Sequence, residues 1–383
     1  MLSKENLMGW GNLTGMLRYG DRWRFQRKLT HEAFHKNANK ALRPLVERQT
    51  HLILQGLLVN SDQFSEKIKR ILGETVLMAV YGYDAASVDD SLFSTVDTAV
   101  RSVSEALVVQ NFLVNAFPWL DYVPEWFPGA TWKIKANEWR RQRDLMLHVP
   151  FEWTRGKMSI GADVHSMLSS WLDKYAHIQP TDSNSSVAEL EDQIRWAAGT
   201  VFFAAIDTTV SSIRTFIMAM AMYPSIQAKA QAEIDRIIGT RLPELADQEV
   251  LKYVECVVKE TLRWRLIKPL AAPHACIQDD TYKGYHIPKG AIVIGNTWAI
   301  SNNPDVYPNP DCFDPDRFLD PSVPEAPAFG FGRRICPGAH HAKSVLFITA
   351  ASILSVFDIR PEVDADGKSI PLNTQQKMNG AVW

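Results

Sequence analysis

The sequence has few cysteines, no long block of like charge and no long hydrophobic run. Its four cysteines lack C-x-x-C spacing, so the pattern indicates neither a disulfide framework nor a structural zinc site. The 41 basic and 43 acidic residues give a formal net charge of -2, without a run that would follow a phosphate backbone, so we expect no nucleic-acid partner. No window holds the roughly eighteen uninterrupted apolar residues of a spanning helix, and the N-terminus lacks a signal-peptide pattern. We therefore expect no transmembrane segment in this chain.

The composition is that of a globular protein. With 383 residues, 46% hydrophobic and 22% charged, the chain can bury the core of one large domain or of two smaller ones. The predicted helices cover Trp23 to about Phe34, much of residues 40–82, Ser186–Met222, Ser225–Ile238 and Gln248–Arg265. Residues 273–296 instead alternate polar and apolar positions around Lys-Gly turns, which predicts short antiparallel strands. The predicted fold class is mainly α with a small β-rich part (α+β).

An aromatic, proline-punctuated segment, NAFPWLDYVPEWFPGATW, interrupts the helical pattern at residues 115–132. Its rings either pack on the core or face outward, toward a membrane surface or a substrate entrance. Both interpretations stay open from the sequence. The outward one predicts peripheral membrane contact through residues 117–132.

Cys336 lies in the stretch FGFGRRICPGAHHA, directly before an apolar, helix-like run. A thiolate at a helix N-terminus is stabilised by the unpaired amides there, and a metal deprotonates a thiol outright. Gly332 and Gly338 permit backbone paths that let amides approach the sulfur. A lone cysteine more often serves as a small buried apolar residue, so this stretch alone leaves two interpretations: a packing residue or a metal ligand.

The spacing around Cys336 decides between them. Five positions match F-x-x-G-x-R-x-C-x-G, the haem-binding motif of the cytochrome P450 family: Phe329, Gly332, Arg334, Cys336 and Gly338. The sequence therefore resembles a haem-thiolate monooxygenase, and the stretch PHAC with the aromatic segment is similar to fungal members of microsomal type. The resemblance implies haem b (iron protoporphyrin IX) with Cys336 as the iron ligand.

A second motif is KETLR at residues 259–263. Glu260 and Arg263 are three residues apart and so lie on one helical face, where an isolated pair would be a solvated surface contact. In the family, E-x-x-R carries a buried ion pair that a later arginine completes. The stretch FDPDRF implies Arg317 as that third member.

A third motif is AAIDTT at residues 204–209, in the middle of the longest predicted helix. An acid and a threonine in an apolar helix are costly unless they are used, although they could also be satisfied by local hydrogen bonds. The resemblance implies that Asp207 and Thr208 relay protons during oxygen activation. Ala205 departs from the family pattern, which has glycine there.

The resemblance also implies groups that bind the haem carboxylates and line the substrate pocket. Trp23 and Arg27 match the family's W-x-x-x-R, and Arg334 and His274 could complete the carboxylate clamp. Without the family, Trp23 and Arg27 would be ordinary packing residues. The implied pocket residues are Phe202, Phe203, Ala204, Leu270, Ala271 and Ala272. They indicate a small apolar substrate and do not identify it.

Electrons must come from outside, because the chain contains no flavin or nicotinamide fingerprint. The resemblance implies an NADPH-dependent flavoprotein reductase as the donor, dioxygen as co-substrate and a place on the cytosolic face of the endoplasmic reticulum membrane. Five basic residues could attract an acidic reductase or could form an ordinary solvated face: Arg22, Arg24, Lys28, Arg333 and Lys343.

The resemblance covers the chain from about Arg18 onward as a single cytochrome P450 domain over residues 1–383. The family's anchor helix and first sheet strands are missing before that point, and GAVW ends before the usual final hairpin, so the expected fold is incomplete. We expect short strands at 273–296 and the haem-binding loop with its following helix at 329–357.

Three functions remain open from the sequence. The first is a monooxygenase that inserts one oxygen atom into an apolar substrate. The second is a haem-thiolate enzyme that rearranges a peroxide without a reductase, which loss of the acid and threonine would have favoured. The third is a truncated, non-catalytic remnant.

Overall fold

The computed structural model describes residues 7–85, 91–107, 111–176, 187–364, 366 and 368–372. Among these residues the chain forms two compact units. The first unit contains the described parts of residues 1–45 and 69–207, and the second contains residues 46–68 and the described parts of 208–377. The N-terminal residues 1–6 and the C-terminal GAVW lie outside the described residues.

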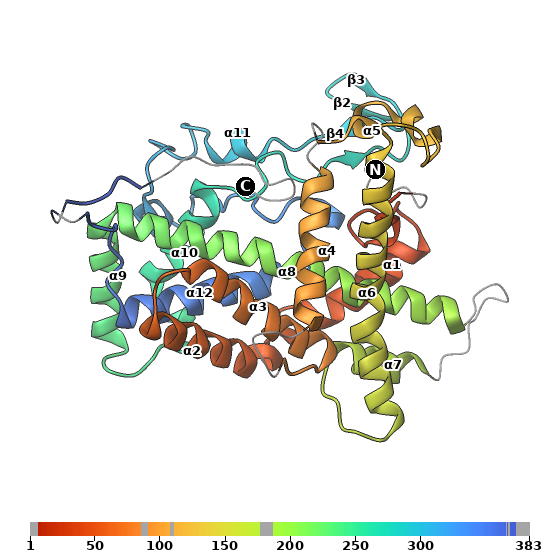
Figure 1. Cartoon of the computed structure of the whole chain (residues 1–383). Helices are drawn as coiled ribbons and strands as arrows, with labels where there is room; N and C mark the ends of the chain where they lie inside the picture. Colours follow the sequence, from red (N-terminus) through yellow and green to blue (C-terminus); the bar gives the residue numbers. More distant parts are fainter. Residues whose placement is uncertain are drawn as a thin grey trace. The chain divides into compact units, whose positions relative to one another are not determined.

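Helices dominate both units, as the sequence predicts, so the fold class is confirmed as mainly α with a small β part (Figure 1). Three helices have residues in both units: α2 (Arg43–Val59), α3 (Phe64–Tyr81) and α8 (Val187–Met222). The other helices of the first unit are η1 (Trp10–Asn12), α1 (Asp21–Phe34), η2 (Ala38–Leu42), α4 (Ser91–Leu107), α5 (Leu113–Ala116), η4 (Pro118–Tyr122), α6 (Thr131–Ser159) and α7 (Met167–Ala176).

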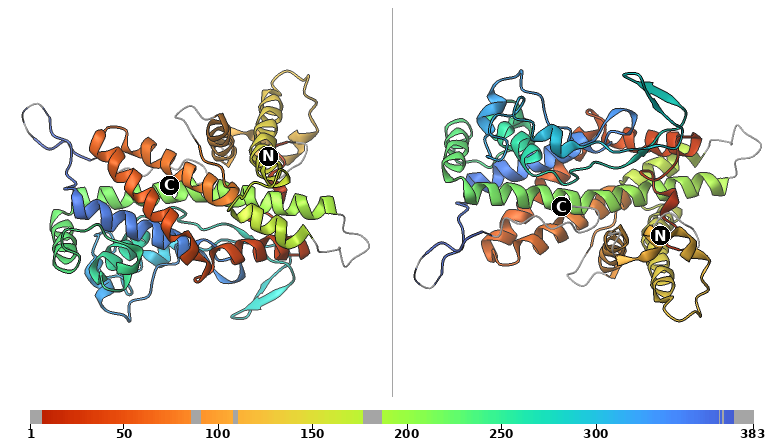
Figure 2. Two further views of the ribbon diagram at one scale, coloured as in Figure 1. Left: turned by 90° about the horizontal axis from the view of Figure 1, so that it is seen from below. Right: turned by 90° about the horizontal axis from the view of Figure 1, so that it is seen from above.

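The core of the first unit forms where helices from distant parts of the sequence meet. Helix α4 packs along α6, and the two lie side by side in both sets of views (Figures 1 and 2). Gly199 of α8 lets α6 approach closely, because a Cβ at that position would lie 2.3 Å from a methyl carbon of Leu147. The only glycine in the long predicted helix is therefore a contact point between helices.

The second unit is built around an amphipathic helix, α10 (Lys252–Trp264), and an apolar helix, α12 (Ala339–Val356). Its helical elements are α9 (Pro224–Ile237), η5 (Leu245–Glu249), α10 (Lys252–Trp264), α11 (Thr297–Ser301), η6 (Pro315–Leu319), η7 (Gly332–Arg334) and α12 (Ala339–Val356). Helix α10 packs against α9, α12 and η6. Apolar residues at helical spacing, among them Val254, Val257 and Val258, are buried on α10.

The helix boundaries follow from local chemistry. Helix α8 ends before Tyr223-Pro224, because proline disfavours helix at the residue before it, and α9 then begins with Pro224 in its first turn. Gly239 has φ +71° just beyond the end of α9, a left-handed conformation that glycine adopts at little cost. The predicted helix from Gln248 to Arg265 is shorter in the structure, because η5 and a break at Val250–Leu251 precede α10.

The strands are few and short. Strands β1 (His274–Ala275) and β4 (Ile292–Val293) form one antiparallel pair, and β2 (Asp280–Tyr282) and β3 (Tyr285–Ile287) form another. Lys283 and Gly284 turn the second hairpin with positive φ values. These strands therefore serve as connectors between α10 and the segment that leads to Cys336.

Two described helices, α8 and α12, are long and apolar enough to cross a membrane by length and composition. In α12, residues 345–354 are buried within the protein. A buried core helix passes the same test of length and composition, so this observation carries little weight for membrane spanning.

Candidate functional site

Cys336 lies in the second unit between η7 and the N-terminus of α12, and its thiol is exposed. The Cys336 amide donates a hydrogen bond to the Phe329 carbonyl at 2.9 Å, which closes the loop. Gly332 has φ +56°, where a residue with a Cβ would be strained. A Cβ at Gly338 would lie 3.9 Å from the Cys336 sulfur, so glycine keeps that side of the sulfur uncovered.

Apolar side chains with unusual exposure surround this loop. Leu270, Phe331 and Ile335 are 53%, 40% and 42% exposed. A Cβ at Gly295 would lie 2.7 Å from the Phe331 ring and 3.6 Å from the Ala271 Cβ, so the segment after α10 and the cysteine loop come together there. Exposed apolar groups beside an exposed thiol form a surface suited to a flat, largely apolar ligand.

Lys268 adds a positive charge to this surface. Burial among the surrounding residues lowers the pKa of the Lys268 amine, and the thiolate of Cys336 opposes that shift. Its carbonyl accepts hydrogen bonds from the Thr297 hydroxyl at 2.8 Å and the Ala271 amide at 3.0 Å, which fixes the turn that carries it. The Lys268 amine lies close enough to Cys336 for the charge of the sulfur to act on it.

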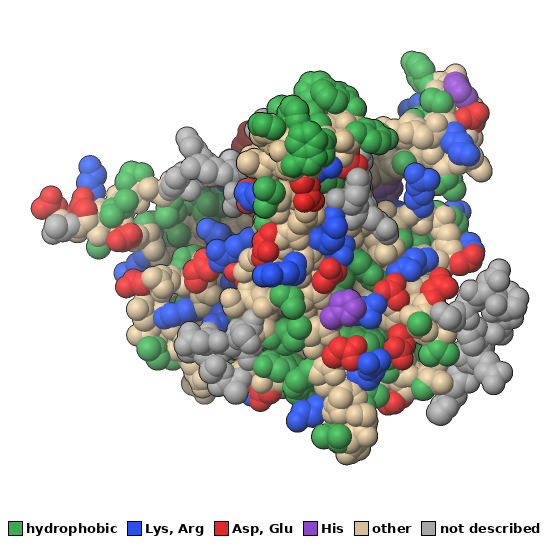
Figure 3. All heavy atoms as spheres, turned by 45° about the vertical axis from the view of Figure 1, so that its right-hand side comes forward, with side chains coloured by type: hydrophobic (Ala, Val, Ile, Leu, Met, Phe, Trp, Pro, Cys, Tyr) green, Lys and Arg blue, Asp and Glu red, His purple; other side chains and the backbone are tan. Residues whose placement is uncertain are grey.

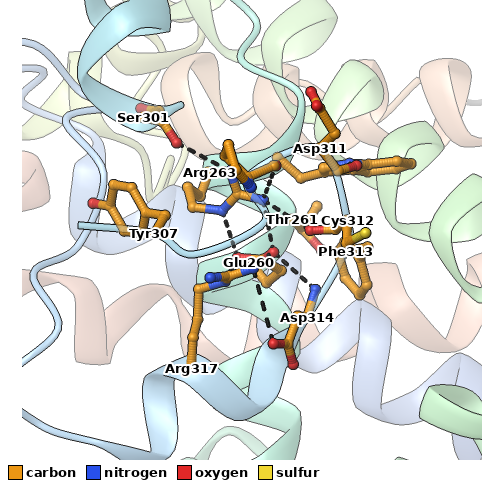
Figure 4. Close-up of polar contacts among 12 residues, drawn as sticks. Glu260, Thr261, Arg263, Ser301, Tyr307, Asp311, Cys312, Phe313, Asp314 and Arg317 are labelled. Atoms are coloured by element: carbon orange, nitrogen blue, oxygen red, sulfur yellow. Dashed lines mark hydrogen bonds and ion pairs between the residues drawn. The ribbon is translucent and has the colours of Figure 1, made fainter. Parts of the chain in front are cut away.

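Glu260, Arg263 and Arg317 form one buried ionic cluster in the second unit, which we call the Glu260 cluster (Figure 4). The Arg263 guanidinium donates to both Glu260 carboxylate oxygens, at 2.7 and 2.8 Å, and Arg317 Nε lies 3.3 Å from the carboxylate. The side chains of Glu260 and Arg263 are fully buried, and that of Arg317 is 5% exposed. The second cation is offset in part by the half-exposed Asp314 carboxylate, 3.9 Å from Arg317, and in part by backbone carbonyls.

Those carbonyls come from the segment that leads toward the cysteine loop. Arg263 donates to the carbonyls of Ser301, Pro310 and Cys312. Arg317 donates to the Pro308 carbonyl at 3.0 Å, and the Asp314 amide donates to Glu260. The Glu260 cluster thus ties α10 to residues 301–317.

Thr208 and the cysteine loop share a cavity of about 50 Å³ within the second unit. Thr208 and Thr209 of α8 line it together with Phe329 of the F-x-x-G motif. Ala342 and Leu346 of α12 form another part of its wall. The structure therefore brings one turn of α8 next to the segment that holds Cys336.

Asp207 precedes Thr208 on α8 and belongs to the first unit. Its carboxylate lies 3.3 Å from the Lys69 amine of α3. The side chain is 27% exposed, so the carboxylate is partly hydrated and partly neutralised by a cation.

The six residues implied for the substrate pocket differ in their surroundings. In the first unit, Phe202 is fully buried and its ring meets Tyr81 edge-on at 6.1 Å, Phe203 packs on Trp10, and Ala204 is exposed. In the second unit, Leu270 and Ala272 are exposed, and Ala271 has φ +51°.

The implied carboxylate-binding residues are divided between the units. Trp23 is buried in the first unit against Tyr19, and Arg27 on the same helix is half-buried. In the second unit His274 is exposed in β1, and burial lowers the pKa of the half-buried Arg334.

The basic residues implied for reductase docking are likewise divided. Arg22 is paired with Asp192, Arg24 with Asp21 and Lys343 with Glu325, whereas Lys28 and Arg333 are exposed.

Comparison with known proteins decides the family. The family model described as Cytochrome P450 matches residues 6–379. The chain belongs to the cytochrome P450 family. It is 38% identical over 378 residues to cytochrome P450 monooxygenase COX2 of Coprinopsis cinerea, covering 97% of this chain and 71% of that protein. It is 40% identical to cytochrome P450 monooxygenase 208 of Postia placenta, covering 95% of this chain and 70% of that protein.

Another fungal relative has a named substrate. The chain is 38% identical to tryptamine 4-monooxygenase of Psilocybe cyanescens, covering 96% of this chain and 73% of that protein. Among solved structures, a zebrafish cytochrome P450 with progesterone shares the fold with a TM-score of 0.76 at 23% identity, over 94% of this chain and 81% of that one. This cytochrome P450 is therefore an oxidoreductase of the monooxygenase type with fungal relatives, as predicted.

The family uses haem iron, dioxygen and a redox partner, and the residues around Cys336 fit a haem group. Among the described residues no group of three His, Cys, Asp or Glu side chains could hold a metal ion. A single exposed thiol suits an iron that brings its own nitrogen ligands. The exposed Leu270, Phe331 and Ile335 give a porphyrin the apolar contacts it needs.

Sequence reasoning missed Lys268, Lys69 and the carbonyl partners of the Glu260 cluster. Only Lys268 could have been found from the sequence, because it is the one charged residue in the apolar stretch from Ile267 to Ala275. Lys69 had none, because it lies 138 positions before its partner Asp207.

The first prediction concerns the Glu260 cluster. Glu260→Gln leaves Arg263 buried without a countercharge and Arg317 with only the half-exposed Asp314 carboxylate at 3.9 Å, so the free energy of unfolding should fall by about 3 to 5 kcal/mol. Urea denaturation followed by circular dichroism measures it. The control is Arg360→Met, which breaks the exposed pair with Asp358 and should cost less than about 1 kcal/mol. Equal losses in the two variants would contradict a structural role for the cluster.

Proposed function

We propose that this cytochrome P450 inserts one oxygen atom of dioxygen into a small apolar organic substrate, with haem b as cofactor and an NADPH-dependent flavoprotein reductase as electron donor. The observation that carries the proposal is the exposed Cys336 thiol at the N-terminus of α12, within an apolar surface. Haem supplies the iron at which dioxygen is activated, and a thiolate ligand favours O–O cleavage.

Cys336 is the proposed iron ligand. Its charge is stabilised by the α12 N-terminus, where the first amides lack helical partners. The whole loop and helix of residues 329–357 form the proposed haem-binding segment of one cytochrome P450 domain. Trp23, Arg27, Arg334 and His274 are the proposed donors to the haem carboxylates, since each offers an N–H group.

Asp207 and Thr208 are the proposed proton relay. The cavity shared by Thr208 and Phe329 supports this role for the threonine, and the partly hydrated Asp207 carboxylate can exchange protons with solvent. Their presence favours the monooxygenase over a peroxide-rearranging enzyme, which needs no proton supply for dioxygen.

The substrate is proposed to be apolar, because Leu270 and Ala272 lie exposed on the segment after α10. Tryptamine, named for one relative, carries an ammonium group, and Lys268 opposes a cation near Cys336. We therefore favour uncharged substrates, tested by spectral titration with tryptamine and with neutral indole. Tighter binding of tryptamine would overturn this preference.

In each unit the exposed basic residues, Lys28 and Arg333, suit an acidic reductase surface.

Membrane contact through residues 117–132 on the cytosolic face of the endoplasmic reticulum is part of the proposal. Trp119, Tyr122 and Trp126 are 63%, 90% and 80% exposed in the first unit, and hydrophobic side chains gather at this tip (Figure 3). Tryptophan and tyrosine rings prefer the boundary between lipid and water. A membrane surface would cover these rings, which water otherwise hydrates.

The test of the iron ligand is Cys336→Ala. The reduced carbon monoxide complex of the unchanged protein should show the red-shifted Soret band of a thiolate haem, and the variant should lose it. Cys312→Ala serves as the control, because Cys312 is also exposed in the second unit. If Cys336→Ala retained the thiolate band, or the unchanged protein showed only a free or histidine-bound haem spectrum, the proposed function would be wrong.

The test of the proton relay is Thr208→Ala. The thiolate spectrum should persist, while product formed per NADPH falls roughly tenfold or more and hydrogen peroxide rises, because a positioned acid contributes about 10²- to 10⁴-fold. Thr209→Ala, in the same cavity, is the matched control and should keep most of the yield. An unchanged product yield in Thr208→Ala would exclude the relay role.

The test of membrane contact is flotation with neutral phosphatidylcholine vesicles. Substituting Tyr122→Ser together with Trp126→Ser should release most of the protein, because each ring buries apolar area worth about 1.5 to 3 kcal/mol. Ile160→Ser, 76% exposed at the end of α6, is the control and should leave binding unchanged. Binding that survives the double substitution would place the contact elsewhere.

A further inference from the structure

Four charged side chains from three helices meet around Asp207 in the first unit. Lys69 of α3 lies 2.6 Å from the Asp97 carboxylate of α4 and 3.3 Å from the Asp207 carboxylate of α8. Arg101 of α4 lies 2.6 Å from the other Asp97 oxygen. We call these residues the Lys69 cluster. It links α4 to the acid of the proposed proton relay through one amine.

Close packing of α3 on α4 holds the cluster in place. Gly73 lies one turn after Lys69, and Phe93 lies one turn before Asp97. A Cβ at Gly73 would lie 2.1 Å from the Phe93 ring, so the ring sits directly on the glycine. The adjacent Lys69–Asp97 pair is therefore fixed in distance by the helix contact.

The charges in the cluster balance but are shared unequally. Lys69 and Asp97 are only 18% and 16% exposed, whereas Arg101 is 69% exposed. Burial opposes the charge of Lys69, but Asp97 and Asp207 overcome it and raise the pKa of the amine. Arg101 also neutralises the Asp97 carboxylate. Asp97 therefore compensates the positive charge of Lys69 only in part, and that charge also attracts the Asp207 carboxylate.

We propose that Lys69 is a positioning residue for the Asp207 carboxylate, and that Asp97 on α4 sets how strongly Lys69 holds it. This inference rests on the proposed function, in which Asp207 relays protons. The longer distance to Asp207 leaves that carboxylate oriented yet free to exchange a proton. Neutralising Asp97 would leave more of the Lys69 charge to act on the Asp207 carboxylate.

Removing Lys69 and removing the charge of Asp97 should have opposite effects on the ion pair at Asp207. Lys69→Met leaves the Asp207 carboxylate without the cation that orients it. A smaller fraction of the NADPH consumed should therefore lead to product. Product per NADPH should fall roughly tenfold, less than the about 10²- to 10⁴-fold that a positioned acid contributes, because Asp207 itself remains. Asp97→Asn removes the competing carboxylate, so Lys69 should bind Asp207 more tightly. Proton release then slows, and the solvent deuterium isotope effect on turnover should increase while product per NADPH stays high.

The controls separate positioning from packing. Arg70→Met removes a cation from the neighbouring position of α3, where it pairs with Glu74 on the same helix, and should change neither product yield nor isotope effect. Lys69→Arg restores the cation and should recover most of the yield. A merely structural lysine would lower thermal stability in Lys69→Met but leave product per NADPH unchanged, which would overturn the proposal.

A readout independent of turnover is the stability of the haem-loaded chain in a double-mutant cycle. If Lys69 and Asp207 interact as proposed, the midpoint losses of Lys69→Met and Asp207→Asn should exceed, when summed, the loss in the double variant. Additive losses would overturn the proposal.

The inference can fail while the proposed function holds. In that case the thiolate spectrum would be found and Thr208→Ala would form less product per NADPH, but Lys69→Met would form as much product per NADPH as the unchanged protein. Absence of the thiolate spectrum in the unchanged protein would instead overturn the proposed function and the inference with it.

Discussion

The buried carboxylate of Glu260 is the interaction on which the second unit depends. It has no access to water, so its charge must be neutralised within the protein by Arg263 and Arg317. The two guanidinium groups then need acceptors for their remaining N–H groups and take them from backbone carbonyls between Ser301 and Cys312. One charge therefore fixes the path of an irregular segment that has little secondary structure of its own.

The Glu260 cluster and the Lys69 cluster contain similar residue types but differ in their exposure to water. The Glu260 cluster is dry and has short contacts to both carboxylate oxygens, which makes any rearrangement expensive. The Lys69 cluster is partly hydrated and divides one amine between two carboxylates at unequal distances. Hydration lowers the cost of moving a charge, so the second arrangement suits an acid that must change its protonation state.

The surface around Cys336 sets a different requirement. The proposed Cys336 thiolate would need positive potential, which the α12 N-terminus and Lys268 can provide, and the proposed porphyrin would need apolar contacts, which Leu270 and Phe331 can offer. Different parts of the same region would meet the two needs: the start of α12 and Lys268 for the charge, and exposed apolar side chains for the porphyrin. Glycine at 295 leaves room for the Phe331 ring, and glycine at 332 adopts the left-handed φ of +56° that the loop requires.

The sequence pattern set no bounds for α4, α6 or α7. The sequence by itself determined the helical stretches that contain α1, α2, α3, α8, α9 and α10, their punctuation by proline and glycine, the family motif around Cys336 and the grouping of Glu260 with Arg263. Each depends on neighbours within a few turns, where periodicity and backbone preference act. Only the tertiary structure decided which cations meet Asp207, which carbonyls serve Arg263, and that Phe202 packs into the core against Tyr81. Those contacts join residues tens to more than a hundred positions apart. An apolar helix gives no sequence signal for which of its faces meets which partner, because burial of any face contributes similar free energy.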